Sequence, residues 1–231
     1  MIDQRRRAML EAMGLTVWRR RGPPVAAADT ATATATDTRG PDAGHDWSSL
    51  TAGIAACERC PLHATRHQAV PGVGDRGARL MVIGEAPGAE EDRRGEPFVG
   101  RAGQLLDAML AAIGLDRHTD VFITNVVKSR PPDNRDPRTD EIEACRPWLD
   151  AQIALVKPAL ILALGRVSAQ SLTQRTQRIG KLRNQWHRFG EAEIPLRATY
   201  HPAYLLRRPA AKAQVWEDLV MVKRQLRAGT A

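Results

Sequence analysis

The sequence has few aromatic residues, few cysteines and no long hydrophobic segment. Phe, Trp and Tyr make up 4% of the 231 residues, so an aromatic side chain in a loop is a candidate for a specific contact. No apolar run reaches the roughly 18 residues that a membrane-spanning helix needs. Three cysteines indicate a metal site or free thiols rather than disulfide bonds. We therefore expect a cytoplasmic protein that does not enter a membrane.

Acidic residues are outnumbered by basic ones, 26 to 34, which gives a net charge of +8. Such a charge favours a polyanionic partner, with nucleic acid first and an anionic membrane surface second. The N-terminal segment is basic, but it carries Glu11, ends in Arg19, Arg20 and Arg21 and has no small-residue cleavage site. It therefore does not resemble a secretory signal.

The chain divides into two parts of different composition. Residues 1–21 are expected to form a short amphipathic helix with a basic face, and residues 23–46 are a low-complexity Ala/Thr/Pro linker that cannot build a core. Segment 1–46 is either a docking tail or a contact for DNA or a repair or replication protein. The globular domain is expected over residues 47–231.

Strand-like and helix-like patterns alternate within that domain. This alternation predicts an α/β fold with a mostly parallel sheet and helices on both faces. Pro147 is expected to kink the predicted helix over residues 139–156 or split it in two. The predicted strands are 80–83, 120–127, 159–165 and 194–202, and the predicted helices are 101–114, 139–156, one from 167 and 211–227.

Polar residues follow three of the predicted strands. Glu85 follows the first strand, Asn125 lies at the end of the second and His201 at the end of the fourth. Each alone is explained as well by a cap, a turn residue or a strand end. Because ligands bind at the carboxyl ends of parallel strands, their convergence at one edge predicts a site.

These residue types suit a pocket for a nucleobase that is flipped out of its stack. The small residues of 84–88 let backbone N–H groups approach a ligand, and Asn125 offers a donor and an acceptor to a base edge. Phe98 either stacks on the base or plugs the core below the loop. The basic loops 128–138 and 201–209 leave the same sheet edge and are expected to hold DNA phosphates.

Four segments together carry a resemblance to a known family. "GEAPGAEEDRRGEPFVGRAGQLLD", "NVVKSRPPDNRDP", "ACRPWL" and "HPAYLLRRP" resemble the family 4 uracil-DNA glycosylases, the iron–sulfur type of bacteria and archaea. The resemblance covers about residues 50–227 and excludes 1–46. It implies a three-layer α/β/α sandwich with a four-stranded parallel sheet, and hydrolysis of the N-glycosidic bond of deoxyuridine in DNA, which releases uracil and leaves an abasic site without a nucleotide cofactor.

The resemblance also implies roles for single residues. Glu85 matches the acid that serves the water or the cation-like sugar, and His201 the residue that stabilises negative charge on uracil. Glu91 matches a second pocket acid, Phe98 the stacking residue and Asn125 the residue that reads the uracil edge. Glu90, Asp92 and Glu96 are expected to be solvated or to pair with nearby arginines. The remaining expected substrate-binding residues are Gly84, Ala86 and Gly88.

The expected DNA contacts are Lys128, Arg130, Arg135, Tyr204, Leu205 and Arg207. Tyr204, Leu205 and Leu206 are also expected to insert as a wedge between bases.

The cysteines depart from the family pattern, in which four cysteines hold a [4Fe–4S] cluster. Cys57, Cys60 and Cys145 match three ligands, but Ser129 stands where the fourth is expected. Three alternatives remain at this point: Ser129 ligates iron as an alkoxide, a cluster binds with three protein ligands, or packing replaces the cluster.

Two other functions compete with the glycosylase. The missing cysteine and the basic N-terminal segment favour a non-catalytic DNA-binding repair module that kept the fold. The acids Glu85, Glu90, Glu91 and Asp92 also permit a Mg²⁺-dependent phosphoesterase, although no second carboxylate cluster follows another strand. For the glycosylase we expect a monomer associated with the nucleoid and bound to uracil-containing DNA.

Overall fold

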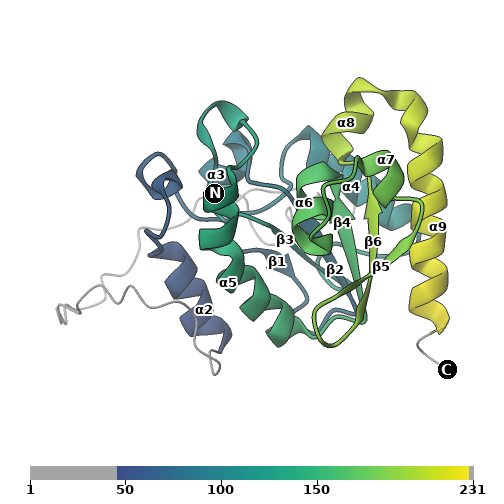
Figure 1. The fold of residues 1–231 in the computed structure, drawn as a ribbon, viewed down its shortest axis with the longest axis horizontal. Coiled ribbons are helices and arrows are strands. Elements are labelled where there is room, and N and C mark those ends of the chain that lie inside the picture. Colours follow the sequence, from purple (N-terminus) through teal and green to yellow (C-terminus); the bar gives the residue numbers. More distant parts are fainter. Residues whose placement is uncertain (1–45, 229–231) are drawn as a thin grey trace, which may run out of the picture. The chain divides into compact units, whose positions relative to one another are not determined.

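The computed structural model describes residues 46–228 and contains a six-stranded mixed sheet (Figure 1). The strand order is β1-β3-β2-β4-β6-β5, and the four central strands are parallel. The α/β fold is therefore confirmed, but two antiparallel edge strands extend the four-stranded parallel sheet that we expected. The strands are β1 (Val73–Gly74), β2 (Leu80–Gly84), β3 (Val121–Asn125), β4 (Leu160–Leu164), β5 (Trp186–Phe189) and β6 (Ile194–Thr199).

Helices cover both faces of the sheet, as the alternating pattern predicted. Successive residues of a strand point to opposite faces. Met81 and Ile83 of β2 belong to the core beneath α2 (Trp47–Ala55), α5 (Thr139–Val156) and α6 (Gly165–Thr173). Leu80 and Val82 belong to the core beneath α4 (Arg101–Ala112) and α9 (Lys212–Ala228). The result is a three-layer α/β/α sandwich.

Several shorter elements complete the domain, and one prediction is wrong in detail. The helix α5 runs unbroken from Thr139 to Val156 through Pro147, so Pro147 does not split it. Trp148 and Leu149, the two residues after the proline, are buried in the core on this face of the sheet, where the Trp148 ring packs against Gly53 of α2, and this packing supports the helix. The shorter elements are η1 (Pro61–Ala64), α3 (Ala89–Arg94), η2 (Pro132–Asn134), α7 (Ile179–Leu182), α8 (Pro202–Arg207) and η3 (Pro209–Ala211).

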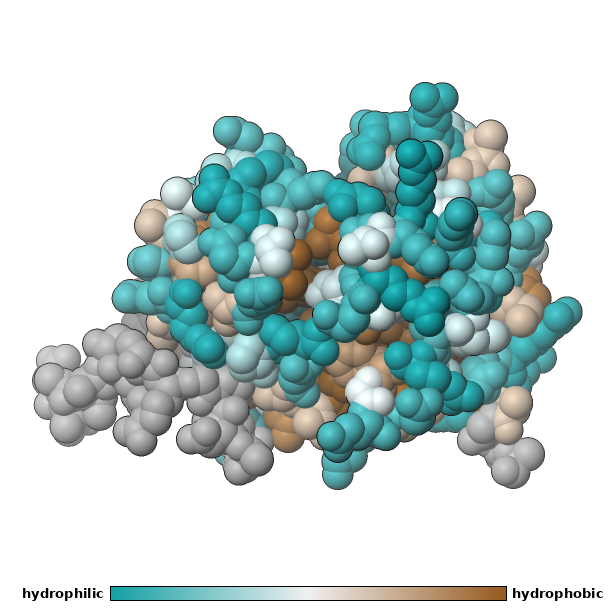
Figure 2. Space-filling view, viewed as in Figure 1, coloured by the Kyte–Doolittle hydropathy of each residue, from teal (hydrophilic) through white to brown (hydrophobic). Residues whose placement is uncertain are grey.

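The parallel register brings the carboxyl ends of β2 and β3 side by side, with Gly84 opposite Asn125. β4 and β6 end at the same edge, since Leu164 pairs with Thr199. The residues that follow these strands therefore meet at one edge of the sheet. Hydrophilic side chains dominate the face shown in Figure 2, and hydrophobic ones show mainly in its hollows.

The predictions made for the N-terminal segment fall on residues that the structure does not describe. The basic helix over 1–21 lies outside the described residues, as does all but residue 46 of the linker. The first described helix begins at Trp47, and Asp46 caps it by accepting a hydrogen bond from Ser49 N at 2.8 Å. Within residues 46–228, no helix combines the length and apolarity needed to cross a bilayer.

Candidate functional site

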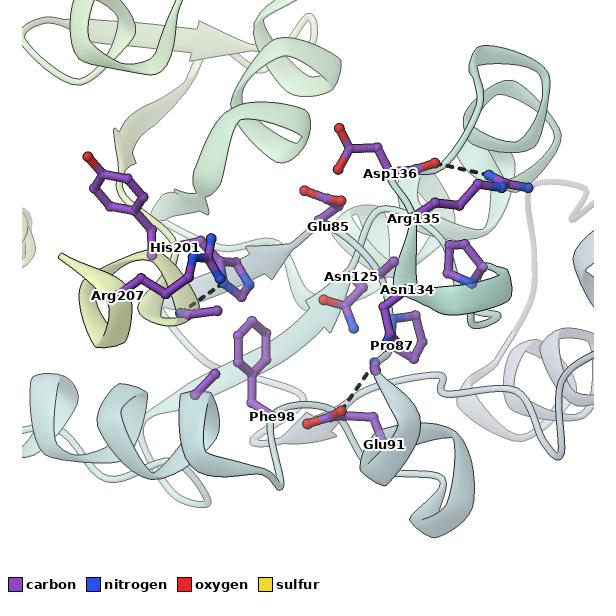
Figure 3. A pocket seen from close by; sticks show the side chains of 16 residues that line it. Glu85, Pro87, Glu91, Phe98, Asn125, Asn134, Arg135, Asp136, His201 and Arg207 are labelled. Carbon is purple, nitrogen blue, oxygen red and sulfur yellow. Dashed lines mark hydrogen bonds between the residues drawn. The ribbon is translucent and has the colours of Figure 1, made fainter.

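A pocket of about 380 Å³ opens at the carboxyl edge of the sheet, a volume that suits a small ligand (Figure 3). Most of the predicted site residues line it, although they come from segments far apart in the sequence. They are Glu85, Ala86, Gly88, Glu91, Phe98, Asn125, Arg135, His201, Tyr204 and Arg207. Gly84 lies beneath the pocket rather than in its lining.

Gly84 permits the close approach of the two side chains that form the pocket floor. A Cβ atom on Gly84 would lie 2.3 Å from Asn125 Oδ1 and 2.6 Å from Phe98 Cζ. No side chain larger than hydrogen fits there without moving them. The glycine at the end of β2 is therefore part of the site, although it reaches no ligand itself.

Asn125 carries an unpaired polar atom. Its side chain is buried, and Oδ1 has no hydrogen-bond partner within the described part of the chain. A buried acceptor without a donor is costly, by about 1–3 kcal/mol, unless a ligand supplies the donor. The N–H group on the edge of a base would meet that requirement.

Phe98 is held in an unusual backbone conformation with φ of 56°. Arg117 clamps this turn, because its guanidinium donates to the carbonyl oxygens of Pro97 at 2.8 Å and Phe98 at 2.9 Å. Gly103 makes room for the same turn, since a Cβ there would lie 1.7 Å from Phe98 O. The ring is buried, lines the pocket and lies 5.4 Å from the His201 ring, centroid to centroid. It is thus both part of the core and a face of the pocket.

Glu91 binds backbone rather than pointing free oxygens at a ligand. Its Oε2 accepts from Gly88 N at 3.1 Å, and its Oε1 accepts from Val99 N at 3.0 Å and Gly100 N at 3.2 Å. One carboxylate thereby joins the loop before α3 to the loop that carries Phe98. Figure 3 shows it below the pocket, bonded to Gly88.

The other acids of this segment have separate roles. Glu90 pairs with Arg93 at the surface, as expected. Asp92 is buried and accepts from His67 N at 3.0 Å, so the expectation that it is solvated or paired with an arginine is wrong. Glu96 pairs with Arg117 at 3.3 Å.

His201 is neutral at pH 7. Burial, reinforced by the positive charge of Arg207, lowers its pKa to about 4. Its Nδ1 accepts from Ala203 N at 3.2 Å, so in the neutral ring the proton lies on Nε2. The turn after β4 packs closely behind it, because a Cβ on Gly165 would lie 3.0 Å from His201 Cβ. The histidine is a fixed, uncharged donor.

The pKa of Glu85 is shifted upward, in the opposite direction to that of His201. Burial and the neighbouring Asp136 carboxylate raise its pKa to about 7, against the opposing charge of Arg166. Figure 3 shows the Glu85 and Asp136 carboxyl groups facing each other at the rim of the pocket. A carboxyl group with such a pKa exchanges its proton near neutral pH, which suits acid–base chemistry.

Two expected DNA contacts lie inside the protein. The Lys128 side chain is buried, and its Nζ donates to Asn125 O at 2.6 Å and Gln152 Oε1 at 2.7 Å. Leu205 is 1% exposed and packs in the core beneath α4 and α9. Both predictions are wrong, because the Lys128 ammonium ties the end of β3 to α5 and Leu205 is on the inner face of α8.

The remaining DNA candidates lie at or near the surface around the pocket. Arg207 is exposed at the pocket rim, and Tyr204 is 37% exposed and stacks on Tyr200. Leu206 is 40% exposed, so it can serve as a wedge where Leu205 cannot. Arg135 is tied to the buried Glu141 at 2.6 Å, which limits its reach.

Arg130 is half-buried and is held close to the chain in the same region. Its Nε donates to Asn134 Oδ1 at 2.8 Å. The basic loop after β3 therefore offers fewer free cations than its composition suggested.

The three cysteines and Ser129 line one cavity of about 10 Å³, room for about one water molecule. Trp148 Nε1 donates to Cys57 Sγ at 3.2 Å, Lys128 N donates to Cys145 Sγ at 3.3 Å and Arg66 Nη1 donates to Ser129 Oγ at 2.9 Å. Burial raises the pKa of the Cys145 thiol to about 11 and also raises that of Cys60. The thiols of Cys60 and Cys145 therefore keep their protons at pH 7 unless a metal displaces them.

This donor set does not fit a cluster held by four thiolates. The fourth donor is a hydroxyl already bonded to Arg66, and the surrounding side chains close the space. In the part of the chain that the structure describes, no three His, Cys, Asp or Glu residues are placed to hold one metal ion. The acids of 85–92 accordingly do not form the cluster that a Mg²⁺-dependent phosphoesterase needs.

Three residues of the site were missed or left without a role in the sequence. Arg117 holds the Phe98 turn, and Asp136 and Arg166 lie beside Glu85. Their partners come from distant segments of the chain, so no local spacing could have found these contacts. Two weaker signals were available: Asp136 lies in the loop 128–138 that was expected at this sheet edge, and Arg166 directly follows the Gly165 that ends a predicted strand.

Comparison with known proteins gives a consistent result. Residues 71–220 match the model of the uracil DNA glycosylase superfamily. A type-4 uracil-DNA glycosylase of Pyrobaculum aerophilum is 47% identical over 174 residues, which cover 73% of this chain and 88% of the relative. Type-4 enzymes of Archaeoglobus fulgidus and Thermotoga maritima are 44% and 42% identical, over 71% and 74% of this chain and 85% and 89% of theirs.

Proposed function

This chain belongs to the uracil DNA glycosylase superfamily, and we propose that it is a type-4 uracil-DNA glycosylase. The enzyme hydrolyses the bond between uracil and deoxyribose in DNA. The observation that supports this most strongly is the pocket itself, where a fixed neutral histidine, an unpaired buried asparagine oxygen and a carboxyl group of raised pKa surround one space.

We propose that Asn125 and Phe98 recognise the base. The unpaired Asn125 Oδ1 accepts the N3–H of uracil, and its amide donates to the adjacent carbonyl oxygen. Cytosine presents an acceptor at N3, so it would leave Oδ1 unsatisfied unless the amide turned over. The Phe98 ring supplies the stacking face, and Gly84 lets both side chains reach the base.

Bond cleavage divides the charge between two ends of the pocket. As the bond between C1′ and N1 breaks, its electron pair goes to uracil and the sugar becomes cation-like. His201 Nε2–H donates to the uracil oxygen that gains negative charge. The ionised Glu85 stabilises the sugar, orients a water molecule and takes its proton as the water oxygen bonds to C1′. The uracil anion then takes up a proton from solvent and Glu85 releases the one it accepted, so the products are uracil and an abasic site.

We propose that the exposed residues of α8 and the loop after it hold the DNA. Arg207 lies at the rim of the pocket, and the exposed Tyr204 and Leu206 can enter the space that a flipped nucleotide leaves. The net charge of +8 supplies the less specific attraction to phosphates, so binding is expected to weaken with salt.

The cluster found in iron–sulfur members plays no part in this reaction scheme. The arrangement of Cys57, Cys60, Cys145 and Ser129 favours the alternative in which packing and hydrogen bonds replace it. If Cys57, Cys60 and Cys145 did bind iron, they would supply three thiolates and join η1 to α5, a structural role remote from the pocket.

The function is tested by incubating the purified protein with matched duplexes that contain one uracil or one thymine, followed by alkaline cleavage of abasic sites. We expect strand cleavage of the uracil duplex alone. Glu85→Gln and His201→Ala should each reduce base release by at least about 100-fold, the range for a general base or an oxyanion donor, while leaving DNA binding in place. DNA binding without base release by the wild-type protein would support the non-catalytic repair module instead.

A further inference from the structure

An ion pair from two separate segments lies beside Glu85. Asp136 follows η2 in the loop that leads to α5, and Arg166 is the second residue of α6. Arg166 Nη2 donates to Asp136 Oδ2. Arg166 is in turn steadied by its own helix, because its Nη1 donates to Gln170 Oε1 at 3.2 Å. The pair thus bridges the rim of the pocket beside the acid that performs the chemistry.

The loop that carries Asp136 is anchored independently of this pair. Glu141 in the first turn of α5 is 1% exposed and accepts from Arg135 at 2.6 and 2.8 Å and from Arg138 N at 2.7 Å. Arg135 also donates to the backbone oxygen of Asp136 at 2.9 Å. The position of the Asp136 backbone is therefore set by a buried carboxylate, which leaves its side chain free to act on Glu85.

We propose that Asp136, held by Arg166, is a positioning residue that sets the orientation and the protonation of the Glu85 carboxyl in the glycosylase reaction. The proposal deepens the function proposed above and rests on it. Neither residue needs to touch the base or the sugar. Their effect is exerted through the carboxyl group that does.

The physical basis is the cost of placing two carboxylates side by side. When two carboxyl groups are in contact, ionising both costs electrostatic free energy, so the two groups share a proton. Arg166 donates to Asp136, and the negative charge and hydrogen bond of Asp136 disfavour the ionisation of Glu85, so the proton favours Glu85. This agrees with the direction of the Glu85 shift, whose causes are burial and the Asp136 charge and hydrogen bond, opposed by Arg166.

Among residues 46–228, no other charged group that lines the pocket explains why the proton favours Glu85. His201 is neutral above about pH 4, and Glu91 is engaged by three backbone N–H groups. Arg135 is bound to Glu141. Arg207, on α8, adds positive charge that would favour ionised Glu85, so it cannot raise the pKa of that carboxyl.

The arrangement predicts opposite effects for its two members. Base release needs ionised Glu85, so in single-turnover assays the logarithm of the rate should rise with pH and level off near pH 7. Asp136→Asn removes the repelling charge, keeps an acceptor oxygen and adds an N–H donor, which should move this bend in the pH–rate profile about one pH unit lower. When each enzyme's rate is divided by its own plateau at high pH, the rate of Asp136→Asn at pH 6 should be about fivefold that of the wild type. Arg166→Gln removes the favourable charge and should move the bend to higher pH, and Arg166→Lys should restore it.

Two matched controls separate this effect from a general change of charge. Asp133→Asn alters an exposed acid of the same loop that does not line the pocket, and Arg175→Gln alters a cation just beyond α6. Neither should move the bend. The carboxyl ¹³C signal of Glu85, assigned by its loss in Glu85→Gln, gives the same titration in DNA-free protein without any turnover.

Each outcome decides the proposal. Opposite shifts in Asp136→Asn and Arg166→Gln, seen in the rates and in the Glu85 signal, support it. An unchanged bend in Asp136→Asn, an equal loss of rate at every pH, or shifts in the same direction would overturn it. If the wild-type protein released no uracil, the proposed function would fail, and the ¹³C titration would still show whether Asp136 controls Glu85.

Discussion

Replacing Gly84 with alanine should damage catalysis far more than one methyl group suggests. The new Cβ would lie 2.3 Å from Asn125 Oδ1 and 2.6 Å from Phe98 Cζ, well inside contact distance. Phe98 cannot retreat easily, because Arg117 binds its carbonyl and Gly103 packs against its backbone. Asn125 is buried and its main-chain oxygen is held by Lys128. The crowding must therefore displace one of the two side chains that we propose to recognise the base.

The expected magnitudes follow from that displacement. Overpacking a rigid core costs about 1–3 kcal/mol of unfolding free energy. A shift of about 1 Å in a group that positions the substrate costs on the order of 100-fold in rate. Gly84→Ala should therefore remain folded, with a single-turnover rate of uracil release about 100-fold below that of the wild type. Unfolding is measured by urea denaturation and the rate with excess enzyme on a uracil duplex.

Gly77→Ala provides the matched control. A Cβ on Gly77 meets only Asp75 Oδ1 at an ordinary contact distance of 3.7 Å. That variant should keep both stability and rate. A Gly84→Ala enzyme within about threefold of the wild-type rate would refute the reasoning, because the floor of the pocket would then be free to move.

Three further changes test other parts of the molecule. Asp218 is fully buried and pairs with Arg183 at 3.0 Å and with Arg197 at 2.8 Å. Asp218→Ala should therefore lower the unfolding free energy by about 3–5 kcal/mol. Asp150→Asn, in the more exposed pair with Arg146, should lower it by less than about 1 kcal/mol. Leu205→Ala should lower the unfolding free energy by about 2–5 kcal/mol, because Leu205 is buried. Leu206→Ala should leave the melting temperature unchanged and slow uracil release from duplex DNA. The reverse pattern would contradict the placement of the wedge at Leu206. Ser129→Cys should increase the iron bound per chain and the absorbance near about 400 nm. An equally high iron content in the wild-type protein would show that its site already holds a cluster, and little iron in both would show that the missing cysteine is not what excludes it.

The central sheet could be predicted because its strands are buried on both faces. The continuous apolar run over 80–83 is typical of a strand in a parallel sheet, since helical patterns alternate with such runs along the chain. The edge strand β5 escaped prediction because its sequence, "WHRF", is four residues long and has two polar side chains between two aromatic ones, so it shows neither an apolar run nor alternating polarity. β1 is two residues long and carries no pattern at all.

The location of the site could be predicted, but the direction of its side chains could not. Parallel topology alone places Glu85, Asn125 and His201 at one edge. Whether a long side chain turns inward depends on partners from other segments. Lys128 turns inward because three buried oxygens receive its ammonium, one of them from Gln152, 24 residues along the chain. The same limitation hid the contact of Asp136 with Arg166 and Glu85.

The acidic stretch within this basic protein consists of groups with different physical states. Glu85 is the acid to which we assign the reaction, and its raised pKa comes from burial and from Asp136. Glu91 and Asp92 accept hydrogen bonds from backbone N–H groups: Glu91 joins two loops at the pocket, and Asp92 holds the backbone of His67. Only Glu90 and Glu96 pair with arginines near the surface. Negative charge is therefore concentrated where a cation-like sugar must be met, and most of it is neutralised locally by backbone groups and arginines. The net positive charge of the chain can then attract DNA without opposing the chemistry at the pocket floor.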